Sequence, residues 1–149
     1  MTSDEKKALI APCGLYCGEC PLYLAYTDES LRNKIAENQG IPAEKVFVCK
    51  GCRAMEGIIA IAGGDTPCET YTCALYDKNV EFCSQCDEFP CLKLAPCADR
   101  AQELPHNTKV YNLVLLERKG IDTFLEKYRE RIRQYRRGKK PRPGGDIQV

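Results

Sequence analysis

The most informative stretch of the sequence is Cys13-Gly-Leu-Tyr-Cys17-Gly-Glu-Cys20, in which three thiols lie within eight residues. Outward from it follow Cys49-Lys-Gly-Cys52, Cys68-Glu-Thr-Tyr-Thr-Cys73 and Cys83-Ser-Gln-Cys86-Asp-Glu-Phe-Pro-Cys91. The chain has 11 cysteines in 149 residues. Thiols separated by a tight turn can converge on one ion, so the clusters predict metal ligation. The predicted ligands are Cys13, Cys17, Cys20, Cys49, Cys52, Cys68, Cys73, Cys83, Cys86 and Cys91.

The N-terminal segment bears on the redox compartment. It carries Asp4 and Glu5 and lacks the apolar stretch of roughly 7–15 residues that a signal peptide needs. No apolar run approaches the ~20 residues that span a bilayer. We therefore expect a cytoplasmic protein, where disulfides are rare. An odd number of cysteines also fits poorly with a closed disulfide framework, so metal ligation is the preferred use of the paired thiols.

Helical signals dominate between the clusters. Pro21 suits the first turn of a helix, Asp28 or Thr27 can cap the next one, and Gly40 ends it. A further helix begins at Asn107 or Thr108 and ends at Gly120. We also expect helical structure over 92–104, broken at Pro96 and stopped by Pro105, and an apolar run over 57–62.

The clearest predicted helix covers residues 122–137. Its apolar positions recur every three or four residues and form one stripe: Ile121, Phe124, Leu125, Tyr128, Ile132 and Tyr135. The predicted fold is mainly α, a small single domain of short helices joined by Cys-rich metal-binding loops. We expect a Cys-rich metal-binding domain over 1–120, an amphipathic basic helix packed on it over 121–137, and a flexible basic tail over 138–149.

Zinc is the metal that the spacing favours. Structural zinc takes four tetrahedral ligands, often from cysteine pairs. Fifteen residues separate Cys52 from Cys68, a spacing typical of two zinc-binding pairs, although four residues separate Cys68 from Cys73. Cys49, Cys52, Cys68 and Cys73 form one predicted site. The other six clustered cysteines supply a second site, share a cluster, or interleave with the first four, so we expect two zinc ions.

Iron is the alternative metal. Cys13-x3-Cys17-x2-Cys20 has the spacing by which radical SAM enzymes hold a [4Fe–4S] cluster, and Cys20-Pro21 resembles the end of a ferredoxin run. Glu19 stands where radical SAM enzymes have Tyr, and the ferredoxin run lacks its fourth Cys. The alternative hypothesis is therefore an iron–sulfur redox or electron-transfer protein. Cys97 is interpreted as a buried packing residue, and His106 as a loop residue.

No grouping in the sequence indicates catalysis. His106 is the only histidine, and no nucleophile with a matching base is evident. The Gly pairs at 63–64 and 144–145 are turn and tail pairs, not a phosphate loop. The interpretation is a non-enzymatic protein.

Basic residues gather at the C-terminal end. Residues 1–128 hold 14 Lys or Arg and 19 Asp or Glu, whereas residues 129–149 hold 8 and 2. A basic segment of this kind can neutralise phosphates. The second alternative is therefore a nucleic-acid-binding adaptor, and an acidic protein is a further candidate for the anionic partner. The candidate phosphate-binding residues are Arg129, Arg131, Arg133, Arg136 and Arg137.

Three segments together resemble a known family: Ala11-Pro-Cys13-Gly-Leu-Tyr-Cys17-Gly-Glu-Cys20-Pro21-Leu-Tyr23, Cys49-Lys-Gly-Cys52-Arg53 and Phe82-Cys83-Ser-Gln-Cys86-Asp-Glu-Phe89-Pro90-Cys91. The family is the Cys-rich bacterial and archaeal group catalogued as domain of unknown function 3795. The resemblance covers roughly residues 10 to 95 and includes all ten clustered cysteines. It implies a metal-binding cytoplasmic domain and brings no reaction or substrate.

Overall fold

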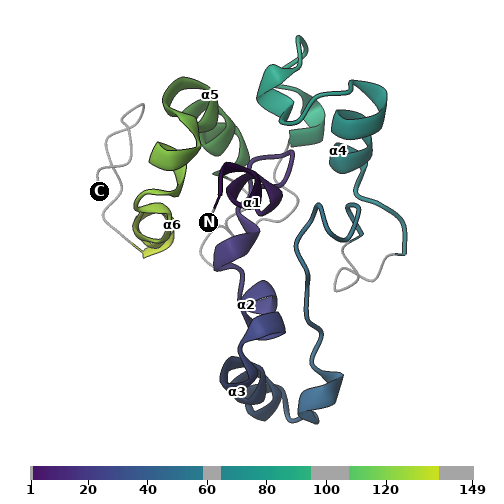
Figure 1. The fold of residues 1–149 in the computed structure, drawn as a ribbon, viewed down its shortest axis with the longest axis vertical. Helices are drawn as coiled ribbons and strands as arrows, with labels where there is room; N and C mark the ends of the chain where they lie inside the picture. Colours follow the sequence, from purple (N-terminus) through teal and green to yellow (C-terminus); the bar gives the residue numbers. More distant parts are fainter. Residues whose placement is uncertain (1, 59–64, 95–107, 138–149) are drawn as a thin grey trace. The chain divides into compact units, whose positions relative to one another are not determined.

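The computed structural model describes residues 2–58, 65–94 and 108–137 (Figure 1). Within these ranges the structure is mainly helical, which confirms the predicted class, and the β structure is limited to two isolated bridges. The chain divides into two compact units. The first joins Met1–Ala11 to Tyr16–Thr72, and the second joins Pro12–Leu15 to Cys73–Val149. The chain therefore enters the second unit briefly at Pro12 and returns to the first at Tyr16.

Short helices make up the first unit. They are α1 (Ser3–Ala8), η1 (Cys17–Glu19), α2 (Pro21–Thr27), α3 (Glu29–Gln39), η2 (Ala43–Lys45) and α4 (Glu69–Thr72). The helix α1 was not anticipated from the sequence, although Thr2 and Glu5 form a capping box at its start.

The boundaries of α2 and α3 follow the predicted signals. Pro21 is the first residue of α2, and the Asp28 carboxylate accepts a hydrogen bond from Leu31 N at the start of α3. Gly40 ends α3 with φ 65°. After η2 the chain runs back along α2, where Cys49 N donates to Leu22 O at 3.0 Å (Figure 1). These caps and turns bring the second cysteine cluster next to the first helix after Cys20.

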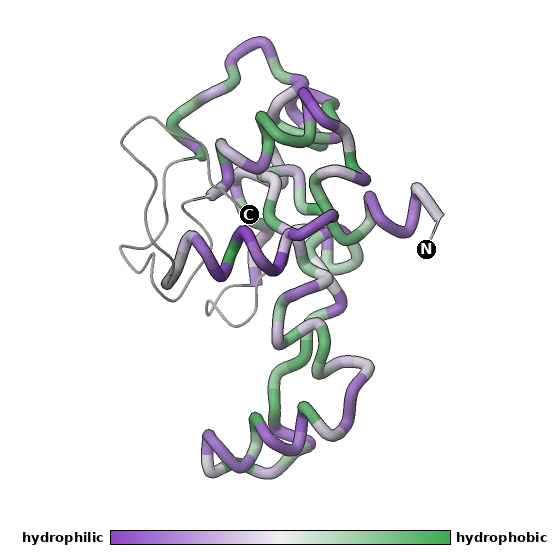
Figure 2. Tube along the Cα trace, turned by 90° about the vertical axis from the view of Figure 1, so that its left-hand side faces the viewer, coloured by the Kyte–Doolittle hydropathy of each residue, from purple (hydrophilic) through white to green (hydrophobic). Residues whose placement is uncertain are grey.

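Small side chains form much of the core of the first unit. Ala25 of α2 and Ala36 of α3 are buried, together with Ile10, Val46 and Tyr71. In Figure 2 the tube along α3, at the bottom of the view, is mostly hydrophilic with few apolar positions. An α-helix with so narrow an apolar face contributes little burial, so other interactions must supply stability to this unit.

Within residues 73–94 and 108–137, the second unit contains five helical elements. They are η4 (Cys73–Asp77, a π-helical turn), η5 (Cys83–Gln85), η6 (Leu92–Leu94), α5 (Lys109–Leu125) and α6 (Tyr128–Arg137). The helix α5 packs against η5 and contains a break at Gly120, which has φ 78° and ψ 172°. The predicted helix end at Gly120 thus coincides with a real interruption.

The continuous helix predicted over 122–137 is wrong. The helix stops after Leu125, and α6 begins only at Tyr128, because Lys127 has a left-handed φ of 56°. The Arg131 guanidinium donates hydrogen bonds to the carbonyls of Phe124 and Glu126, which the break leaves without helical partners. The apolar period continues through the break, with Phe124 and Tyr128 buried and their rings 5.3 Å apart, so periodicity did not reveal it.

Asn112 holds the core of the second unit to the short segment 12–15. This side chain on α5 is 2% exposed, and its Nδ2 donates to Gly14 O at 2.9 Å. Gly14 has φ 85°, and a Cβ there would lie 3.0 Å from Leu113 Cγ. Cys83 N donates to Pro12 O at 2.9 Å on the other side of Cys13. Both bonds fix the backbone around Cys13.

Several predicted segments lie outside the described residues. This applies to most of the apolar run at 57–62, to residues 95–104 of the predicted 92–104 helix, and to the tail 138–149. The described part of the 92–104 segment is η6. The domain boundaries predicted after residues 120 and 137 stay predictions, whereas the compact units divide the chain elsewhere.

Replacing Asn112 with Ala is expected to lower the free energy of unfolding by about 1–3 kcal/mol, because the Gly14 carbonyl loses its buried donor. Asn33→Ala removes an exposed Asn from α3 and is expected to change it by less than about 0.5 kcal/mol. Urea unfolding followed by circular dichroism measures both. Equal effects of the two substitutions would contradict this assignment.

Candidate metal centre

The first cysteine turn of the first unit is η1. Cys20 N donates to Cys17 O at 2.9 Å, which closes a tight turn between the two thiols. Gly18 lies inside this turn, where a Cβ would collide with the ring of Tyr16. Pro21 then begins α2 directly after Cys20. The sequence thus places two thiols at the N-terminal end of a helix, joined by a turn whose glycine lies against the Tyr16 ring.

The second cysteine turn is Cys49–Cys52. Gly51 adopts a φ of 96°, and its N–H points at Cys49 Sγ, 3.4 Å away. Cys52 N donates to Cys17 Sγ at 3.3 Å, which links this turn to the first one. Backbone N–H groups that point at sulfur favour the thiolate, since they stabilise its charge.

The loop after Cys52 leads to Cys68, which is the fifth thiol of the first unit. Gly57 N donates to Cys52 O, and Cys68 N donates to Gly57 O, both at 2.9 Å. Arg53 Nε donates to Ile10 O at 2.8 Å and anchors the loop to a fully buried residue. The backbone around Cys68 is therefore tied to the Cys49–Cys52 turn.

In the second unit the central turn is Cys83–Cys86. Cys86 N donates to Cys83 O at 3.2 Å, and the Gln85 side-chain oxygen accepts from Phe82 N at 3.0 Å and Glu81 N at 2.9 Å. The side chain of Gln85 therefore holds the entry to the turn, a role that the sequence pattern did not reveal.

Four other thiols lie close enough to Cys83 to affect its ionisation. Burial raises the pKa of the Cys83 thiol to about 12, and charge repulsion from neighbouring thiolates adds to this shift. The contributing thiolates are Cys13, Cys91, Cys73 and Cys86. Five cysteines of the second unit therefore lie within electrostatic range of one centre. Without a cation, the Cys83 thiol stays protonated at neutral pH.

The structure distributes the ten predicted ligands differently from the sequence-based grouping. Cys73 interacts with Cys83, whereas Cys49 and Cys52 belong to the first unit with Cys68. The opening motif is divided as well, because Cys13 interacts with Cys83 and Cys17 accepts a bond from Cys52 N. The sequence carried no signal for this division, since thiols four or five residues apart join different units.

The thiols are grouped without a closed ligand shell. Among the described residues no disulfide forms, and no three His, Cys, Asp or Glu residues are arranged to hold an ion. Nine of the ten clustered cysteines are partly buried, and Cys91 is exposed. Cys97 and His106 lie outside the described residues.

One sulfur in this region was not considered from the sequence. Met55 Sδ lies 3.5 Å from Cys49 Sγ and accepts a hydrogen bond from Lys50 N at 3.4 Å. The available sequence signal was its position three residues after Cys52, in a chain with only two methionines.

The basic residues of α6 differ in their surroundings. Arg131 is 8% exposed and is engaged with helix-end carbonyls, so it is not a surface cation. Arg129 and Arg133 are exposed, whereas the side chains of Arg136 and Arg137 lie outside the described part of the structure. Binding of an anionic partner through the remaining arginines stays a prediction.

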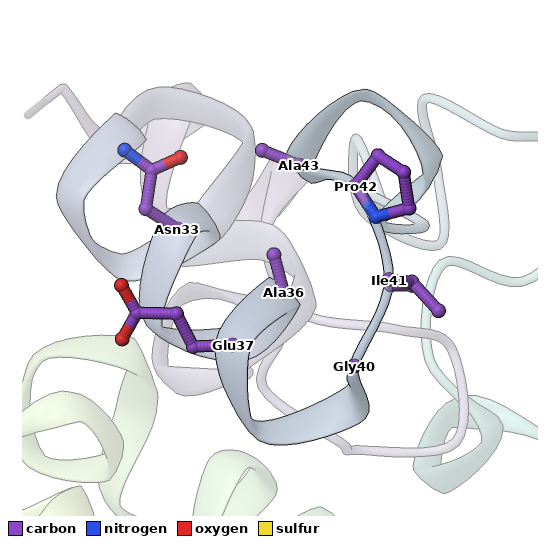
Figure 3. Close-up of a pocket in the computed structure, with 7 residues that line it drawn as sticks. All are labelled: Asn33, Ala36, Glu37, Gly40, Ile41, Pro42 and Ala43. Carbon is purple, nitrogen blue, oxygen red and sulfur yellow. The ribbon is translucent and has the colours of Figure 1, made fainter.

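A surface hollow is lined by residues between positions 33 and 43, a stretch without cysteine. It has a volume of about 440 Å³, and Figure 3 shows the side chains around it. Its lining offers the Glu37 carboxylate and the Asn33 amide as polar groups, with no thiol. The full lining is Asn33, Ala36, Glu37, Gly40, Ile41, Pro42 and Ala43. This hollow holds no pair of groups suited to catalysis.

Comparison with known proteins gives one match. A family model described as "Protein of unknown function (DUF3795)" matches residues 9–96, which include all ten clustered cysteines. No curated protein and no solved structure gives a significant match. In the part of the chain that the structure describes, no helix has the length and apolar character required to cross a membrane.

Gly57 provides a test of the loop that ties Cys52 to Cys68. Both Gly57 and Gly40 have left-handed φ, at 79° and 65°, so Ala at either site costs about 1–2 kcal/mol. A Cβ at Gly57 would also lie 2.6 Å from the Tyr71 ring, whereas nothing lies within 4 Å at Gly40. We expect Gly57→Ala to lower the melting temperature clearly more than Gly40→Ala in thermal unfolding. Similar melting temperatures for the two variants would show that the loop adapts freely.

Proposed function

Since the chain belongs to the DUF3795 family, whose description assigns no activity, we propose a function from its own thiols. The protein is a small, non-enzymatic metal-binding protein in which two sets of cysteine thiolates hold zinc. The metal stabilises the loops between the short helices. Its role in the cell is to present this metal-stabilised surface rather than to catalyse a reaction.

The four thiols that raise the pKa of Cys83, together with the closed Cys83–Cys86 turn, support this proposal most strongly. Thiols buried for packing have no reason to cluster, because each is a small apolar group that any aliphatic side chain replaces. Thiolates brought together repel one another, and a divalent cation converts this repulsion into attraction. The cluster therefore stabilises the fold only when a cation joins it.

The donor set fits zinc. Structural zinc sites are built from Cys-x2-Cys turns and take four thiolates at about 2.3 Å. In the second unit Cys13, Cys73, Cys83 and Cys86 would hold the ion, with the exposed Cys91 as a fifth thiol. In the first unit Cys17, Cys20, Cys49 and Cys52 would hold it, with Cys68 as the fifth. Bound zinc supplies charge neutralisation and cross-links the loops.

The free energy of zinc binding is of the same size as the stability of a small domain. Zinc binding to small finger peptides contributes about 10–16 kcal/mol at neutral pH. A domain of this size has a total stability of about 5–15 kcal/mol. The small apolar core, with alanines in α2 and α3, leaves room for a contribution of this magnitude.

Substituting one thiol in each unit tests the zinc assignment. Cys49→Ser and Cys86→Ser are each expected to remove about one of two zinc ions and to lower the melting temperature, since a serine hydroxyl is a poor zinc ligand. The matched control is Cys97→Ser, a cysteine outside the four clusters, which is expected to keep both ions. Metal content by elemental analysis and unfolding by calorimetry are the measurements. Unchanged zinc content and melting in both cluster variants would refute the proposal.

The visible spectrum separates zinc from iron. Protein purified without oxygen is expected to be colourless and to contain zinc, because its thiols lie in Cys-x2-Cys turns of separate units. Cys13 interacts with Cys83, whereas Cys17 accepts a hydrogen bond from Cys52 N. The opening motif therefore does not favour one [4Fe–4S] cluster. A brown protein with broad absorption and stoichiometric iron would instead support the redox alternative.

A further inference from the structure

The thioether of Met55 lies against the thiol of Cys49. The Cys49 S–H donates to Met55 Sδ at 3.5 Å, and Lys50 N donates to the same Sδ at 3.4 Å. Both side chains are partly buried, so an ion has access to them from solvent. Neither zinc ligation nor the family match accounts for a methionine at this place.

The backbone of the loop fixes the position of Met55. Met55 N donates to Gly51 O at 3.0 Å, and Gly57 N donates to Cys52 O at 2.9 Å. Arg53 Nε anchors the loop to Ile10 O. The loop therefore folds back over the Cys49–Cys52 turn. Because the backbone of the loop is fixed in this way, the Met55 thioether is held against Cys49.

Further sulfurs converge on the same turn. Cys17 Sγ accepts a hydrogen bond from Cys52 N, and Cys49 Sγ accepts one from Gly51 N. The turn therefore brings together thiols and one thioether on backbone N–H groups that favour sulfur donors.

A cation that takes the place of the proton between the Cys49 and Met55 sulfurs is held by lone pairs of both atoms, and the thiol proton is released to solvent. Thiolate and thioether are soft ligands that together select Cu(I). Zinc draws on Cys, His, Asp and Glu, and a thioether is not among its usual ligands.

We propose that Met55 and Cys49 form a Cu(I) site in which the Met55 thioether and the Cys49 sulfur are the ligands. This inference rests on the proposed function, because Cys49 is one of the zinc ligands there; it adds Cu(I) as a second metal that this turn takes in place of zinc. Cu(I) enters already reduced and displaces zinc without any change in the oxidation state of the sulfurs.

Competition for Cu(I) tests the proposal. The full-length protein and Met55→Leu are titrated without oxygen against the bicinchoninate complex of Cu(I). Leu matches Met in volume, so the fold is retained. We expect Met55→Leu to bind Cu(I) roughly tenfold more weakly, as loss of a supporting ligand does in metal sites, with its zinc content unchanged.

Selenium substitution supplies the second readout. The chain has two methionines, Met1 and Met55, so selenomethionine protein carries selenium at both and the labelled Met55→Leu variant only at Met1. X-ray absorption at the selenium edge of the Cu(I)-loaded protein is expected to show a copper neighbour that disappears in Met55→Leu.

Each outcome decides the question. Equal Cu(I) affinities and no selenium–copper neighbour, with zinc still bound, would overturn the Cu(I) site and leave the proposed function standing. Failure to bind either metal would overturn both. A selenium–copper signal that persists in Met55→Leu would assign the contact to Met1 and also overturn the proposal.

Discussion

Repulsion between neighbouring thiolates is the constraint on which this structure depends. In the second unit Cys83 lies among four other thiols, and burial together with their charges opposes its ionisation. In the first unit, the backbone N–H groups of Gly51 and Cys52 donate hydrogen bonds to the sulfurs of Cys49 and Cys17. Protonated, such clusters offer only weak S–H interactions. With a cation bound, the same geometry becomes a cross-link between chain segments that share little apolar surface.

The cysteines of the first cluster do not all belong to the same unit. Cys13 belongs to the second unit, although the residues before Pro12 and after Leu15 belong to the first. The buried Asn112 and the Cys83 amide both bond to the backbone of this short insertion. The first cysteine cluster therefore supplies thiols to both units.

The sequence predicted the ends of helices better than it predicted which cysteines group together. Pro21, Asp28 and Gly40 act at helix ends as expected, because caps depend on residues close in sequence. The break at Glu126–Lys127 was missed because it depends on Arg131, a residue that the charge pattern placed at the surface. Likewise, the spacing placed Cys73 in one site with Cys49, whereas the two belong to different units, and it did not indicate Met55. The partners of these sulfurs depend on tertiary contacts, which the spacing of residues in the sequence does not describe.

Differential alkylation of the thiols tests most directly whether they are metal-bound. Anaerobic full-length protein is treated with iodoacetamide before and after removal of metal by a chelator, and the modified cysteines are mapped by mass spectrometry. If the clustered thiolates hold ions, those in both units resist alkylation until the metal is removed and then react together. If they react equally fast with and without the chelator, the sulfurs are not ligands and the account is contradicted.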